Sequence, residues 1–138
     1  MEFPPSLQSI KFNIATVSAG SLDFSNVTNL KELSFYILVM NSGAIKLPPS
    51  VEKIDFSSST LMINELDLSQ LTNLNYLNLG ELGYSYQTGG IPVTLTLPPN
   101  LNESALSSVN AGRKPVILKT GSTIVNKPDW FDKYVQYL

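Results

Sequence analysis

The sequence predicts a β-rich repeat solenoid, in which short units stack and a parallel sheet lines one face. Two observations support this fold class. The phrase FPPSLQSIKF at residues 3–12 returns as LPPSVEKIDF at residues 47–56, and LDFSNVTNLKELSF at residues 22–35 returns as LDLSQLTNLNYLNL at residues 66–79. Each of these long phrases also divides into two shorter units that share one apolar pattern. The chain therefore repeats a small structural element.

The shorter unit has an L-x-x-L-x-L pattern. It occurs four times, as Leu7/Ile10/Phe12, Leu30/Leu33/Phe35, Val51/Ile54/Phe56 and Leu74/Leu77/Leu79. The period is about 22 residues, within the range of 20–29 for leucine-rich units. The last two apolar positions of each unit are two residues apart, which predicts a short strand with one buried face. The Pro-Pro pairs cannot lie inside a sheet ladder, so they precede the strand.

These phrases resemble the leucine-rich repeat superfamily, in particular the bacterial surface and secreted type with LPxS and LDLSxLTNLxxLxL units. The resemblance implies a parallel sheet on the concave face, mostly loops or 3₁₀ turns on the convex face, and low helix content. It covers residues 3–82 and, less closely, residues 95–106. The predicted repeat region is residues 1–106, with about five units and an insertion at residues 83–90. The resemblance also implies non-enzymatic recognition of a protein partner, with a glycan as the other option. The chain is then a fragment of a longer secreted or cell-surface protein.

Two features depart from the family pattern. The turn asparagine of the family is replaced by Ala15, Leu38, Ser59 and Leu82, so these turns need other hydrogen-bond partners. The fifth unit, which runs from Leu101 to Leu106, has a serine at position 104 where the family has a leucine.

Residues 107–138 are predicted to be a divergent C-terminal cap or the start of a further segment. Residues 115–118 and 122–125 are predicted to pair as two strands around the turn at residues 119–121. Residues 128–134 are predicted to be a short helix or a coil. Trp130, Phe131 and Tyr134 then either cover the last repeat or lead into a further segment.

The candidate binding residues face outward beside the strand leucines. On the concave face they are Lys11, Ser34, Tyr36, Lys53, Asp55, Tyr76 and Asn78, and in the insertion they are Tyr84 and Tyr86. Tyrosine gives a large contact area with few torsions to fix, which favours recognition. The alternatives are an ordinary solvated sheet face and a tolerated surface loop.

The composition excludes several classes of function. The chain has no cysteine and no histidine, which removes cysteine nucleophiles, histidine general bases, and thiolate and imidazole ligands for zinc. Its net charge of −2 argues against nucleic acid as a partner, and no apolar run is long enough to insert into a membrane. We predict no catalytic residue, no metal and no cofactor. Asp23 and Asp67 lie at equivalent repeat positions, which favours a structural role as acceptors of backbone N–H bonds.

A competing prediction is structural. The units are then a spacer, or an array that associates with copies of itself through the repeat ends, because an open sheet edge invites another chain.

Overall fold

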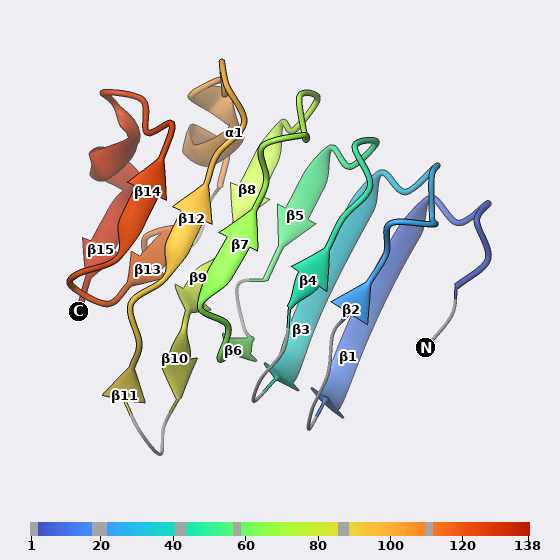
Figure 1. The fold of residues 1–138 in the computed structure, drawn as a ribbon, viewed down its shortest axis with the longest axis horizontal. Coiled ribbons are helices and arrows are strands. Elements are labelled where there is room, and N and C mark those ends of the chain that lie inside the picture. The colour runs from blue at the N-terminus through green and yellow to red at the C-terminus, as the bar shows by residue number, and fades with distance from the viewer. Residues whose placement is uncertain (1–2, 18–21, 41–43, 57–58, 86–88, 110–111) are drawn as a thin grey trace.

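The computed structural model describes all residues except 1–2, 18–21, 41–43, 57–58, 86–88 and 110–111 (Figure 1). Within the described residues the fold is β-rich, with one four-residue α-helix, α1 (Ser104–Ser107), and one 3₁₀ helix, η1 (Phe131–Tyr134). The strands are β1 (Ser9–Val17), β2 (Leu22–Asp23), β3 (Glu32–Met40), β4 (Ile45–Lys46), β5 (Lys53–Asp55), β6 (Thr60–Leu61), β7 (Glu65–Asp67), β8 (Tyr76–Asn78), β9 (Gly80–Leu82), β10 (Tyr84–Ser85), β11 (Gly89–Gly90), β12 (Thr94–Thr96), β13 (Val116–Leu118), β14 (Thr123–Val125) and β15 (Val135–Tyr137). The predicted low helix content is confirmed.

The main sheet is parallel throughout and has the order β15-β13-β9-β6-β3-β5-β8, with β1 on the other edge of β3. Its register follows the apolar pattern of the sequence. Ile10 pairs with Leu33, Leu33 with Ile54, and Ile54 with Leu77. All four side chains are buried on the same side of the sheet, so the four units of the sequence occupy equivalent places.

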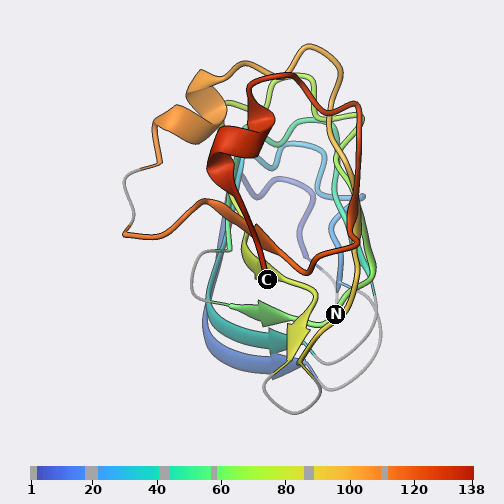
Figure 2. The same ribbon diagram turned by 90° about the vertical axis from the view of Figure 1, so that its left-hand side faces the viewer.

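A second layer of short parallel strands faces the main sheet. It contains the pair β2-β4 and the trio β7-β12-β14, and Figure 2 shows the two layers on opposite sides of the molecule. We predicted mostly loops or 3₁₀ turns on this face, so that prediction needs correction. The reason is local, since the segments around Leu66 and Leu95 alternate buried and less buried residues as strands do.

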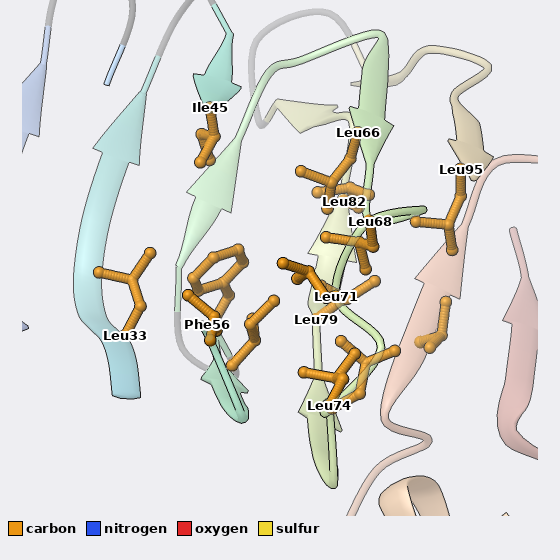
Figure 3. Packing of buried hydrophobic residues seen from close by; sticks show 14 of the residues in the cluster. Leu33, Ile45, Phe56, Leu66, Leu68, Leu71, Leu74, Leu79, Leu82 and Leu95 are labelled. Atoms are coloured by element: carbon orange, nitrogen blue, oxygen red, sulfur yellow. The ribbon is translucent and has the colours of Figure 1, made fainter. Parts of the chain in front are cut away.

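The core fills the space between the layers. Phe56 from the main sheet lies there with Leu66, Leu68 and Leu95 from the second layer (Figure 3). Phe56 is fully buried, and its ring stacks on that of Phe35 with the centroids 4.3 Å apart and the planes 9° apart. Burial of this column against both layers is the main favourable contribution to folding.

Backbone bonds of one recurring kind connect neighbouring units at the start of each strand. The carbonyl of Gln8 accepts from the N–H groups of residues 31 and 32 at 2.8 and 3.1 Å, and the carbonyls of Lys31 and Glu52 do the same for the units that follow. In one unit the hydroxyl of Ser59 also donates to the carbonyl of Phe35 at 3.1 Å. Ser59 therefore provides a turn bond at one of the positions that lack the family asparagine.

The fifth unit does not form a strand. The amide oxygen of Asn102 accepts from the backbone N–H of Ser104 at 3.0 Å, and α1 starts there with Ala105 and Leu106 buried. The prediction that residues 101–106 contain the strand of a fifth L-x-x-L-x-L unit is therefore wrong. An Asx bond at the start favours a helical turn, and a serine replaces the leucine that would anchor a strand.

The C-terminal residues continue both layers. β13 and β14 are strands, as predicted, but they do not pair with each other. β13 joins β9 and β15 in the main sheet, and β14 joins β12 in the second layer. The turn between them includes Gly121 with a φ of 98° and takes the chain from one layer to the other. Phe131 of η1 is fully buried in the core, and Trp130 and Tyr134 pack against the core with partial burial.

Candidate binding surface

The predicted concave-face residues gather on the outer side of the main sheet, opposite the core. The strand register places them in two rows, which are Ser9, Glu32, Lys53 and Tyr76, and Lys11, Ser34, Asp55 and Asn78. Tyr36 lies further along β3, opposite Asn13. The period of two along each strand therefore brings the predicted residues together as one surface, which we call the outer face.

A small pocket of about 130 Å³ lies in the outer face. It is lined by Lys11, Glu32, Leu33, Ser34, Lys53 and Asp55. Two cations and two carboxylates lie around this pocket, so its charge is balanced. Glu32 was not among the predicted binding residues, although its place between Ser9 and Lys53 in the first row is a signal that would have found it.

Two tyrosines flank the pocket in different ways. Tyr36 is 53% exposed, one of the few large apolar side chains in the described part of the chain that reach solvent. The ammonium of Lys53 lies 4.7 Å from the ring centroid of the partly buried Tyr76. This cation–π contact holds the Lys53 side chain over the sheet and orders one wall of the pocket.

The solvent-exposed part of the outer face ends at β8. Asn78 retains only 4% exposure, and α1 packs beside β8. Beyond this strand, Arg113 forms an ion pair with Glu81, and Ile117 is buried although it is in register with Glu81. Asn78 is therefore not available to a partner in this structure, and the open surface extends over β1, β3, β5 and the start of β8.

The insertion forms a small hairpin. β10 and β11 pair in antiparallel fashion, with Tyr84 opposite Gly90. Tyr86 lies outside the described residues, and only the backbone of Tyr84 is described. In Figure 1 this hairpin extends beyond the ends of the neighbouring strands, away from the helical turn α1.

Asp23 and Asp67 have the structural role that their repeat positions predict. A carboxylate oxygen of each accepts from the backbone N–H two residues later, on Ser25 and Ser69, at 2.9 Å. Hydrogen bonds from the serine side chains, and next from these backbone N–H groups, lower the pKa of both carboxyl groups, because a hydrogen bond to the ionised form stabilises it. Among the described residues, no three acidic side chains come together as metal ligands would.

Comparison with protein-family models, with curated proteins and with solved structures finds no match for this chain. Within the described residues, none of the helices has the length and apolar character needed to span a bilayer.

Proposed function

We propose that the chain is a leucine-rich-repeat-type solenoid that recognises a protein partner, without catalysis, through its outer face. The repeated phrases, their parallel in-register strands and the core between two layers support the solenoid. In this proposal the module belongs to a longer bacterial surface or secreted protein. A glycan is the other ligand class compatible with a polar face that carries tyrosines.

The observation that carries the proposal is the convergence of polar and aromatic side chains from separate strands on one rigid sheet. Lys11, Glu32, Lys53 and Asp55 alternate in charge around one pocket, with Tyr36 and Tyr76 beside it. Such a surface matches a partner with interspersed charges of both signs, because complementary potentials give specificity. The tyrosines supply the contact area that anchors a complex.

The experiment compares two double variants in capture of a partner from extracts. Tyr36→Ala/Tyr76→Ala removes the anchors of the outer face, whereas Gln70→Ala/Thr72→Ala changes exposed residues in the turns that follow the second layer. We expect a protein captured by the wild type to be lost from the first variant and kept by the second, with equal circular dichroism spectra. Equal capture by both variants would place the binding site elsewhere.

A second candidate function is self-association through the repeat ends. Three exposed apolar side chains, Val125, Tyr137 and Leu138, lie on or next to the edge strands β14 and β15. The strand β1 is the edge of the main sheet at the other end. Light scattering over a range of protein concentrations separates the two candidates, because assembly raises the mass with concentration and a monomeric recognition module does not.

A further inference from the structure

A second depression lies at the C-terminal end of the molecule, and its chemistry differs from that of the outer face. It has a volume of about 440 Å³, within the usual size range of ligand sites. Its lining includes Arg113, Lys114, Lys133, Tyr134 and Gln136. Three of these side chains are cations, whereas the outer-face pocket has two cations and two carboxylates.

The distribution of charge along the chain points to the same place. Residues 107–138 carry five of the nine lysine and arginine residues and only two of the eleven acidic residues, a net charge of +3. Residues 1–106 carry a net charge of −5, in agreement with −2 for the whole chain. The depression is thus a local positive site on an otherwise acidic protein, a pattern that attracts anionic ligands.

The cations have partners inside the protein but keep donors for a ligand. Arg113 forms an ion pair with Glu81, and Lys133 with Glu103 at 2.8 Å. Lys114 donates to the backbone carbonyl of Lys133. A guanidinium has five N–H donors and an ammonium three, and the side chains of Arg113 and Lys133 are 57% and 63% exposed.

The net charge of the site also depends on the two carboxylates that form ion pairs with its lining cations, Glu81 and Glu103. Hydrogen bonds from Lys133 and Tyr134 lower the pKa of Glu103, so this group is ionised at neutral pH. Glu81 and Glu103 together offset two of the three cations, which leaves one positive charge and unused donors beside Tyr134.

We infer that this depression binds the carboxylate side chains of an acidic peptide segment. The fork of Arg113 matches a carboxylate with two parallel bonds, and the volume accommodates one or two acidic side chains. The inference deepens the proposed function and rests on it, since the segment belongs to the protein partner. It adds a charged contact outside the outer face, at a site that shares no lining residue with the outer-face pocket.

The test is a titration of the whole chain with an amidated hexaglutamate peptide, and with hexaglutamine as the neutral control. Trp130 is the only tryptophan, and its ring lies 6.0 Å from that of Tyr134 in the wall of the depression. We expect a saturable change in tryptophan fluorescence, and heat in calorimetry, with hexaglutamate alone. Absence of saturable binding by both methods overturns the inference. Inorganic phosphate is a third probe, and equally tight phosphate binding would overturn the assignment to a peptide.

Two variants make the test specific. Arg113→Gln/Lys133→Gln should weaken peptide binding about tenfold, because both exposed charge contacts with the peptide are lost. Glu81→Gln should strengthen it about threefold, because the substitution frees Arg113 from its internal partner. If Glu81 had only a structural role, Glu81→Gln would not raise the affinity for hexaglutamate.

The matched control is Lys31→Gln/Lys46→Gln, which removes the same charge from exposed sites outside the depression. If this control lost as much hexaglutamate affinity as Arg113→Gln/Lys133→Gln, the effect would depend on net charge alone. That result would contradict binding in the depression. The titration needs no natural partner, and Tyr36→Ala/Tyr76→Ala should bind hexaglutamate normally. Failure of the outer-face proposal and failure of this inference are thus distinguishable.

Discussion

Truncation of Phe56 tests whether the core column packs as described. The side chain has no solvent exposure and stacks on Phe35 at 4.3 Å. Phe56→Ala removes this contact and leaves a cavity, which together cost about 4 kcal/mol. For a chain of 138 residues, 1 kcal/mol corresponds to a fall in Tm of about 3–4 °C. The expected decrease in Tm is therefore about 14 °C.

Urea denaturation followed by circular dichroism measures the loss, with two variants for comparison. Phe56→Leu should cost only about 1–2 kcal/mol, because the next unit has Leu79 at this position and most of the volume remains. Phe12→Ala should cost less than Phe56→Ala, because Phe12 is at the edge of the column and only partly buried. A loss for Phe56→Ala no larger than that for Phe12→Ala would refute the packing argument.

Three further predictions concern the turns. Gly83→Ala should lower the free energy of unfolding by about 2 kcal/mol or more, because Gly83 has a φ of +74° and an added Cβ would lie 2.4 Å from the Val93 side chain. Gly112→Ala is the control, and it should change thermal stability little because the space around Gly112 is open. Ser59→Ala should cost about 1 kcal/mol in urea denaturation by loss of the bond to Phe35, and no loss would mean that this turn is satisfied without Ser59. The folded pKa of Asp67 lies below its ordinary value of 3.8, so its contribution to stability is present above this pH and is lost as the pH falls through the folded pKa. Asp67→Asn should flatten the acid limb of the stability curve, and an unchanged limb would contradict the assigned bond.

The register of the main sheet is predictable because it depends on local signals. The Pro-Pro pairs fix where a strand can start, and the leucine spacing fixes which side is buried. The second layer was missed because its strands are only two or three residues long. A segment such as Leu22–Asp23 has too few residues to show a period.

A turn motif at residues 128–131 predicts the last strand of the main sheet, although these residues lack the leucine pattern. The backbone N–H of Phe131 donates to the carbonyl of Pro128 at 3.0 Å, and Val51 and Pro48 form the same bond at 3.4 Å. The motif Pro-x-x-apolar therefore precedes a strand at residues 128–131 as it does at residues 48–51, although at residues 98–101 it precedes α1. A search for this turn, in place of the whole leucine pattern, would have found the last strand of the main sheet.

The limits of the outer face depend on the segment where the repeat pattern breaks. If residues 101–106 formed a strand, the row that ends in Asn78 would continue across it. Instead α1 occupies that place, Asn78 is buried, and the chain returns with Arg113 beside Glu81. Sequence periodicity shows which side chains point outward, but it does not show which of them another segment covers. A partner that contacts both the outer-face pocket and the basic depression must therefore bridge the covered region around β8.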